Sequence, residues 1–169
     1  MDVNAEYVEV KSSGIHHKGV FAAKHIPKGT RIIEYVGEKL TKAQSEKRAD
    51  VYLEQNEKDP EKNGAVYIFE LNKKYDIDGN VPNNPAKYIN HSCDPNAEPD
   101  IIKGKIWIIA LQDIQKGEEI TYDYGYDLDS WEDHPCYCGT KNCLGYIVGE
   151  DQRDKLKKEL AKKNSQNKK

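Results

Sequence analysis

Three of the four cysteines lie within eight residues, as Cys-x-Cys-x4-Cys over residues 136–143. Two thiols separated by one residue rarely reach the geometry of a mutual disulfide. Three thiolates on one short loop suit a tetrahedral zinc ion that needs one further ligand. The spacing leaves Cys93 or His134 as that ligand, and free reduced thiols as the alternative. This stretch is therefore expected to be a loop organised by a metal.

The longest uninterrupted apolar run is only six residues, over 106–111. A membrane-spanning helix needs about 20 such residues, so no membrane association is expected. The first residues, Met-Asp-Val-Asn-Ala-Glu, have neither the basic start nor the apolar centre of a secretory signal. With 169 residues, the chain is long enough for one domain with its own core. We expect a soluble intracellular protein, cytoplasmic or nuclear, with reduced cysteines.

Charged residues are distributed unevenly along the chain. Residues 112–133 contain eight acidic residues and one lysine, whereas residues 150–169 contain eight basic residues and four acidic ones. An acidic body repels nucleic acid and attracts a cationic partner such as a lysine-rich peptide. The basic tail lacks interleaved aromatic residues, so no direct nucleic-acid partner is expected. A merely solvated surface is the alternative.

Short segments rich in alternating and β-branched residues, bounded by glycine and proline, predict a mainly β domain. The expected strands cover residues 7–11, 20–23, 31–36, 65–71, 74–78, 98–102, 105–111 and 118–124. A capping box formed by Thr41 and Gln44 predicts one helix over residues 42–56. Residues 59–64 are expected to form a loop, and residues 151–163 a terminal helix.

Several segments, in this order, resemble the signature blocks of SET-domain protein lysine methyltransferases. They are Ile15-His-His-Lys-Gly-Val-Phe-Ala22, Tyr35-Val-Gly-Glu38, Lys87-Tyr-Ile-Asn-His-Ser-Cys-Asp-Pro-Asn96 and Gly117-Glu-Glu-Ile-Thr-Tyr-Asp-Tyr-Gly125, followed by the post-SET block Cys136-Tyr-Cys-Gly-Thr-Lys-Asn-Cys143. The resemblance implies a SET-domain β-clip, α+β by count, with a threaded C-terminal segment and one inserted helix. It implies a SET domain over residues 5–127, a post-SET zinc segment over 128–148 and a basic helix or tail over 149–169.

The resemblance also implies a reaction. The family transfers a methyl group from S-adenosylmethionine to a lysine side-chain amine and releases S-adenosylhomocysteine. The expected substrate is a lysine-rich protein or peptide, with a histone-like tail favoured. By resemblance, Tyr124 is the catalytic-site tyrosine, Tyr122 sets how many methyl groups are added and Tyr35 lines the lysine channel. A tyrosine at position 122 suggests mono- or dimethylation, since its hydroxyl occupies the room that a further methyl group needs.

The same resemblance assigns the cofactor-binding and metal-binding residues. Asn90 and His91 match the cofactor-binding pair, and His17, Lys18 and Gly19 lie where the family has a Gly-x-Gly turn, with Tyr124 beside the transferred methyl. The four zinc ligands implied are Cys93, Cys136, Cys138 and Cys143, which would form a structural site without an open position.

Two departures from the family pattern raise questions. His17 occupies the place of the first glycine of Gly-x-Gly, where a Cβ restricts the turn. The few residues before the first strand contain no cysteine-rich segment, which leaves the terminal helix or a second subunit of a homodimer to pack there. The rival interpretations are a peptide-binding module without catalysis, a purely structural zinc domain and a nucleic-acid binder that uses the tail.

Overall fold

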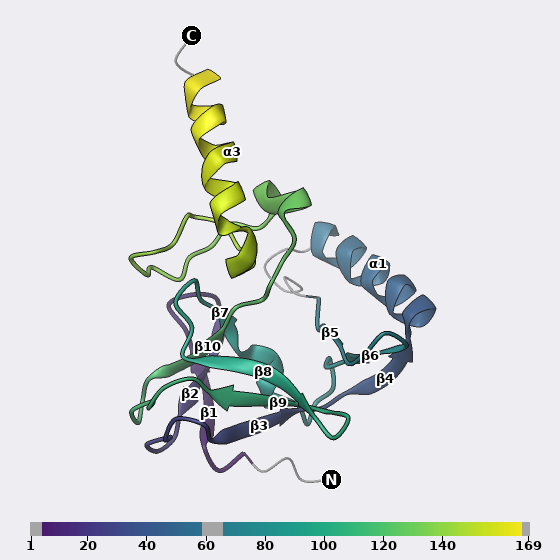
Figure 1. Cartoon of the computed structure of the whole chain (residues 1–169). Coiled ribbons are helices and arrows are strands. Elements are labelled where there is room, and N and C mark those ends of the chain that lie inside the picture. Colours follow the sequence, from purple (N-terminus) through teal and green to yellow (C-terminus); the bar gives the residue numbers. More distant parts are fainter. Residues whose placement is uncertain (1–4, 59–65, 167–169) are drawn as a thin grey trace.

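The structure, a computed structural model, describes residues 5–58 and 66–166 and contains three small β-sheets (Figure 1). The first has the order β1 (Val8–Ser12), β2 (Lys18–Ala22), β10 (Glu119–Tyr122), β7 (Asn90–His91). The second has the order β3 (Arg31–Tyr35), β9 (Lys105–Ala110), β8 (Ala97–Ile102), and the third has the order β4 (Glu38–Thr41), β6 (Tyr75–Asp78), β5 (Ile68–Glu70). Short strands with few helices confirm the predicted fold class.

The helix α1 (Lys42–Lys58) begins at the predicted capping box. The backbone N–H of Thr41 donates to Oε1 of Gln44 at 2.9 Å, and that of Gln44 donates to Oγ1 of Thr41 at 3.4 Å. The helix is joined to the third sheet by the hydroxyl of Tyr52, which donates to the buried carboxylate of Asp78 at 2.7 Å. The inserted helix is therefore fixed to β6.

The hydrophobic core is built mainly from β-branched side chains of the first two sheets. In β9, Ile106 and Ile108 are buried while Trp107 and Ile109 are more exposed, as strand alternation requires. The other fully buried isoleucines include Ile26, Ile32, Ile33, Ile89, Ile114 and Ile120. Each such side chain contributes about 1.5–3 kcal/mol through removal of apolar surface from water. The last buried residue of this connected core along the chain is Tyr122, on β10.

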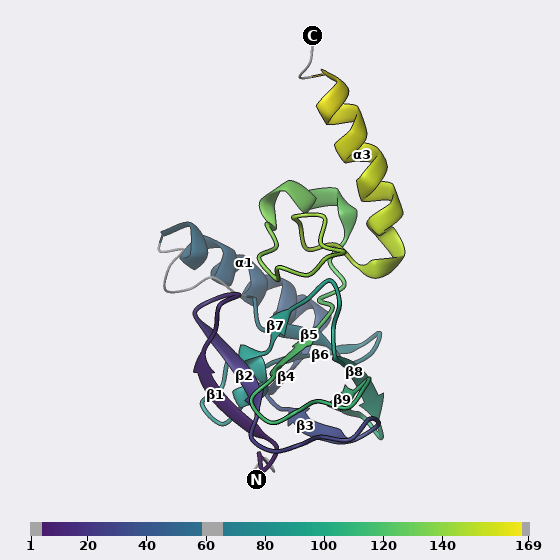
Figure 2. The same cartoon turned by 90° about the vertical axis from the view of Figure 1, so that its left-hand side faces the viewer.

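The chain beyond β10 forms a separate layer above the sheets. It contains the short helix η2 (Leu128–Asp133), the cysteine loop, a single turn η3 (Glu150–Gln152) and the helix α3 (Arg153–Gln166). Figures 1 and 2 show α3 projecting away from the sheets, with the loops of the cysteine segment between them. The side chains of residues 123–147 are all partly or fully exposed. Contacts other than a hydrophobic core must therefore hold this segment.

Several elements differ from the sequence expectation. The strands β4 and β7 were not predicted, because four and two residues are too short for a pattern. The strand expected up to residue 124 ends at Tyr122, because the N–H of Tyr124 donates to the ring of His91 instead of a neighbouring strand. The helix α3 continues to Gln166. The loop expected over 59–64 and the start of the strand expected from residue 65 lie outside the described residues.

Candidate functional site

The two-residue strand β7 brings two distant motifs side by side. It pairs in parallel with β10, so that Asn90 lies opposite Thr121 and His91 lies opposite Tyr122. The Asn-His pair and the Thr-Tyr-Asp-Tyr motif therefore meet at one edge of the first sheet. The rings of His91 and Tyr124 are in edge contact, with centroids 5.3 Å apart.

A cavity of about 550 Å³ opens at this edge. Its walls come from the turn before β2, the segment around β7, Tyr124 and the cysteine segment. The lining residues are Ile15, His16, His17, Lys18, Tyr67, Lys87, Tyr88, Asn90, His91, Tyr124, Asp133, His134, Pro135, Cys136, Tyr137 and Ile147. The volume falls within the range of small-molecule and cofactor sites.

Asn90 is held in one orientation by the protein. Its amide nitrogen donates to Oε1 of Glu119 at 2.7 Å and to the carbonyl of Lys18 at 2.9 Å. Its Oδ1 accepts no hydrogen bond from the described residues, so an acceptor is left for a ligand. A Cβ on Gly19 would lie 2.2 Å from the same Oε1 of Glu119, so a side chain there would displace the carboxylate that holds Asn90.

The turn between β1 and β2 has an unusual backbone at His17. Its φ is +23°, in the region that favours glycine, so the departure noted in the sequence places a side chain at a strained position. The rings of His16 and His17 contact edge to face, with centroids 4.3 Å apart. Both rings line the cavity.

His91 is buried and neutral. Burial, together with the positive charge of Arg153, lowers its pKa to about 4 despite the carboxylate of Asp123. Its Nδ1 accepts a hydrogen bond from the N–H of Tyr124 at 3.1 Å, which leaves the proton on Nε2. That nitrogen lies 3.5 Å from Sγ of Cys93. His91 therefore connects the backbone of Tyr124 to the cysteine cluster.

The hydroxyls of Tyr122, at the end of β10, and Tyr124, two residues later, have different surroundings. Tyr124 donates its hydroxyl to the carbonyl of Ile89 at 2.9 Å, which leaves the lone pairs of its oxygen free. The hydroxyl of Tyr122 makes no hydrogen bond within the described part of the chain, although the residue is only 9% exposed. Burial raises the pKa of both phenols well above the ordinary value, and neighbouring tyrosines raise it further. Both hydroxyls therefore remain protonated at neutral pH.

Tyr35 does not line the cavity but lies in a row of aromatic rings that leads to it. Successive centroids are 5.3 Å apart from Tyr35 to Phe69, 6.0 Å to Tyr122, 5.1 Å to Tyr124 and 5.6 Å to Tyr126. The hydroxyl of Tyr35 donates to the carbonyl of Tyr67 at 2.9 Å, and burial raises its pKa.

Sequence reasoning missed Phe69, Tyr67 and Tyr126 as parts of this arrangement. Phe69 and Tyr126 stand in the row of rings, whereas Tyr67 lines the cavity. The excess of 11 tyrosines over two phenylalanines is the signal in the sequence that could have pointed to them. Composition does not, however, say which tyrosines meet in space.

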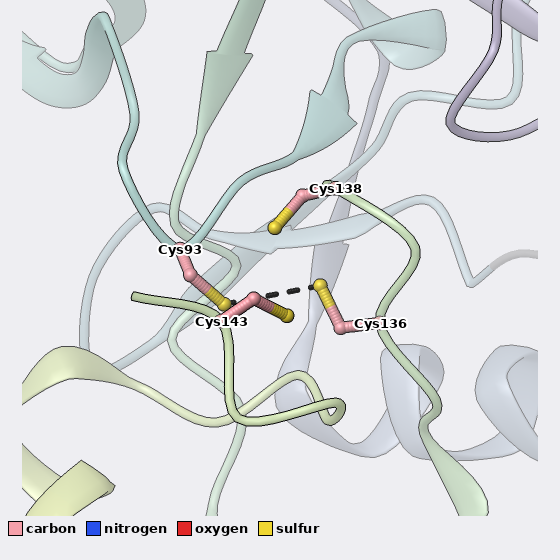
Figure 3. A group of neighbouring side chains, drawn as sticks. All are labelled: Cys93, Cys136, Cys138 and Cys143. Atoms are coloured by element: carbon pink, nitrogen blue, oxygen red, sulfur yellow. Dashed lines mark hydrogen bonds between the residues drawn. The ribbon is translucent and has the colours of Figure 1, made fainter. Parts of the chain in front are cut away.

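The four cysteines converge on one point (Figure 3), and one of them, Cys136, lines the cavity. Their Sγ atoms all lie within 4.8 Å of one another, and those of Cys93 and Cys136 are 3.8 Å apart. Zinc–thiolate bonds of about 2.3 Å in a tetrahedron put sulfurs roughly 3.8 Å apart, so this donor set fits zinc. His134 is not part of the group: its ring packs on Tyr126, with centroids 4.8 Å apart. The spacing left Cys93 and His134 as candidates for the fourth ligand. The structure places Cys93, and not His134, next to the other three sulfurs.

The residues around the cysteine loop differ in whether they line the cavity. Ile147 lines the cavity, whereas Tyr146 packs edge to face on Trp131, with centroids 4.5 Å apart. Trp131 therefore anchors the acidic segment. Tyr137, between two of the cysteines, lines the cavity and is 66% exposed. An exposed aromatic ring at the mouth of a cavity is suited to cover a bound ligand.

Comparison with known proteins agrees with this geometry. The SET domain family matches residues 17–125. The chain belongs to the SET-domain family. Human "Histone-lysine N-methyltransferase 2D" is 38% identical over 145 residues, which cover 83% of this chain and 2% of the relative. The "Histone-lysine N-methyltransferase, H3 lysine-4 specific" proteins of Chaetomium globosum and Saccharomyces cerevisiae are 39% and 38% identical over 146 and 141 residues.

The matched region is a small part of each relative. This SET-domain chain spans 2% of the human relative and 13% and 12% of the two fungal ones, while 83%, 83% and 80% of the chain is covered. Among the described helices, none is both long and apolar enough to cross a membrane.

Proposed function

We propose that this chain is an S-adenosylmethionine-dependent protein-lysine N-methyltransferase. The observation that carries the proposal is the convergence of Tyr124, Asn90 and His91 on one cavity bordered by a four-cysteine cluster. The assignment of the SET domain to residues 5–127, the post-SET zinc segment to 128–148 and the basic tail to 149–169 is part of the same proposal.

The cavity offers groups suited to S-adenosylmethionine, which when bound supplies a methyl group on a positively charged sulfur. Oδ1 of Asn90 is free to accept from the ammonium group of the methionine part. His17 and Lys18 line the same wall, with Gly19 next to them in β2, and Ile147 and Tyr137 supply apolar surface for the purine. A zinc ion on the four thiolates would be structural, because no coordination position is left for water.

The chain must also make the substrate amine reactive. A free lysine has a pKa near 10.4, so deprotonation at pH 7 costs about 4.6 kcal/mol. The aromatic row from Tyr35 to Tyr126 is an apolar, poorly solvated surface that lowers the pKa of an entering ammonium group. The hydroxyls of Tyr122 and Tyr124 remain protonated and orient the amine through hydrogen bonds. A phenol with a raised pKa is no general base, so Tyr124 positions the reactants instead of removing the proton.

The proposed substrate is a basic protein, and a histone tail is favoured. The similar proteins are named for histone lysine methylation, and two of those cited are named for lysine 4 of histone H3. The segment 112–133 carries eight acidic residues and one lysine, and Asp133 reaches the cavity wall. This charge attracts a lysine-rich tail. A histone substrate would place the protein at chromatin.

Methyl transfer from labelled S-adenosylmethionine to an array of lysine-rich peptides tests the proposal. We expect transfer to a subset of basic peptides and none to the same peptides with arginine in place of lysine. Calorimetric binding of the methyl donor and of peptides separates the rival interpretations. A peptide-binding module would bind peptides without transferring methyl, and a purely structural zinc domain would bind neither.

The variant Tyr122→Phe is expected to increase the yield of the more highly methylated product. The change removes a hydroxyl that makes no hydrogen bond within the described residues, and so makes room beside the amine. Mass spectrometry of peptide products at equal extent of reaction measures the shift. Tyr75→Phe makes the same chemical change outside the row of rings that contains Tyr122 and should leave the product ratio unchanged. An unchanged ratio in Tyr122→Phe would refute the assigned role.

Methyl transfer is expected to accelerate with pH between about 7 and 9.5. The neutral fraction of a lysine amine grows up to tenfold per pH unit below its pKa. Burial raises the pKa of Tyr124, so the phenol does not deprotonate within this window. The measurement is kcat/KM against pH at constant ionic strength, with stability checked at each pH. A decline below pH 9 in the folded enzyme would contradict the protonated role of Tyr124.

A further inference from the structure

Arg153, the first residue of α3, contacts three separate parts of the chain. Its Nη1 donates to the carbonyl of Cys93 at 2.7 Å, its Nη2 donates to Oδ2 of Asp123 at 2.7 Å, and its Nε donates to the carbonyl of Val148 at 3.3 Å. The side chain is only 14% exposed. The planar, forked guanidinium can satisfy three acceptors at once, which a lysine ammonium on its flexible stem does less well.

The carboxylate of Asp123 binds Arg153 and also accepts hydrogen bonds from two further parts of the backbone. Its Oδ1 accepts from the N–H of Gly125 at 3.0 Å, and its Oδ2 accepts from the N–H of Glu150 at 3.0 Å as well as from Arg153. Asp123 lies between the two site tyrosines in the sequence, on the exit of β10. The pair of side chains therefore ties the chain that carries those tyrosines to the base of α3.

The other two acceptors flank the cysteine cluster. Cys93 supplies the sulfur that comes from the body of the protein, and Val148 is the first buried residue after the cysteine loop. Because no side chain over 123–147 is buried, the loop depends on polar contacts and on the metal to stay over the cavity. Arg153 joins the C-terminal end of this loop, at Val148, to the backbone of Cys93 in the body and to the carboxylate of Asp123.

We propose that Arg153 is a positioning residue that keeps the cysteine segment, residues 128–148, closed over the cofactor cavity. It touches neither the four sulfurs nor the site hydroxyls and acts through the backbone of Cys93 and Val148 and the carboxylate of Asp123. The inference rests on the proposed function, with zinc on the four cysteines. It makes the base of α3, which lies beyond the SET match over residues 17–125, a part of the methyl-transfer unit.

The rest of α3 makes few contacts that could hold the cysteine segment closed in place of Arg153. Leu156 is the buried side chain of this helix among those that the structure describes, and the helix then projects away from the body (Figure 1). Lys163, near the other end, pairs with Glu132 on the surface, where an ion pair contributes little. The contacts between α3 and the rest of the site are therefore concentrated in the first two turns of the helix.

The test compares Arg153→Lys and Arg153→Gln with Lys157→Gln, a matched change on the same helix. Lys157 is 60% exposed and pairs only with Asp154 among the described residues. The zinc-loaded full chain is mixed with excess chromogenic chelator, and the zinc release rate is recorded. Binding of S-adenosylmethionine is measured by calorimetry, and the thermal midpoint by circular dichroism. Neither binding nor release requires methyl transfer.

Both Arg153 variants are expected to release zinc about 10–100-fold faster, as is typical when a group supporting a metal ligand is removed. Their Kd for S-adenosylmethionine should rise by a similar factor, whereas Lys157→Gln should match the wild type. Adding Asp123→Asn to Arg153→Gln should change release little further, because the two residues share one contact.

Two results would overturn the proposal. One is zinc release from Arg153→Lys at the rate of the control variant. The other is a lower thermal midpoint with unchanged zinc release and cofactor binding, which would make Arg153 a support of the whole fold only. A wild-type chain that methylates no peptide would instead refute the proposed function, and the zinc-release comparison would still decide the role of Arg153.

Discussion

The Tyr124→Phe enzyme is expected to bind S-adenosylmethionine as the wild type does and to transfer methyl about 10²–10³-fold more slowly. That factor is typical of removing one preorganised hydrogen-bonding group from a reacting centre. The lone pairs of the Tyr124 oxygen are free because its proton is directed to the carbonyl of Ile89. Phenylalanine keeps the ring contact with His91 but has no oxygen to orient the amine. Single-turnover rates and cofactor Kd values give the two readouts.

The expected fall in stability is small by comparison. The carbonyl of Ile89 loses its hydroxyl partner, which costs about 1–3 kcal/mol. For a chain of this size each kcal/mol lowers the thermal midpoint by about 2–4 °C, so the variant stays folded at assay temperature. Tyr75→Phe is the matched control and should retain full rate. Retention of more than half the wild-type rate in Tyr124→Phe would remove this hydroxyl from the mechanism.

Much of the fold was predictable because local patterns agree with it. The strand expected over residues 105–111 from their apolar, β-branched side chains matches β9, and the capping box at Thr41 marks the start of α1. The two-residue strand β7 was not predictable, since its pairing with β10 depends on segments about 30 residues apart. The end of β10 was overestimated for a related reason. The ring of His91, distant in sequence, takes the N–H that would continue the strand.

The site was predictable where a motif names residues and unpredictable where only tertiary packing does. Asn90, His91 and Tyr124 line one cavity and the fourth sulfur of the cluster belongs to Cys93, while their roles in cofactor binding, catalysis and metal binding stay predictions. Tyr35, which the resemblance places in the lysine channel, stands at the end of the row of rings that leads to the cavity, and its role in the channel stays a prediction. The junction of Asp123 with α3 could not be foreseen, because no pattern links an aspartate just after a strand to an arginine 30 residues later.

Removal of the metal is expected to abolish cofactor binding while leaving the sheets folded. The connected core extends from Val20 to Tyr122 and includes no residue of the cysteine segment. That segment is closed by a few backbone bonds, such as the N–H of Cys136 to the carbonyl of Gly145 at 2.9 Å. Structural zinc sites supply folding free energy directly, so thiolates without zinc should not keep this segment ordered. The cavity would then lose Cys136, Tyr137 and Ile147 from its wall.

Hydrogen exchange read by mass spectrometry separates these two parts of the chain. After chelation, or in Cys93→Ser, amides of residues 128–148 should exchange much faster, while those of β2 and β9 stay protected. The Kd for S-adenosylmethionine should rise by about 100-fold or more, given that second-shell changes alone reach 10–100-fold in metal affinity. Added zinc should restore the chelated wild type but not Cys93→Ser, and Lys141→Ala, an exposed change in the same loop, should behave as the wild type. Uniform exchange across the whole chain would show that the metal supports the core. Unchanged exchange over 128–148 would show that the thiols alone hold the segment closed.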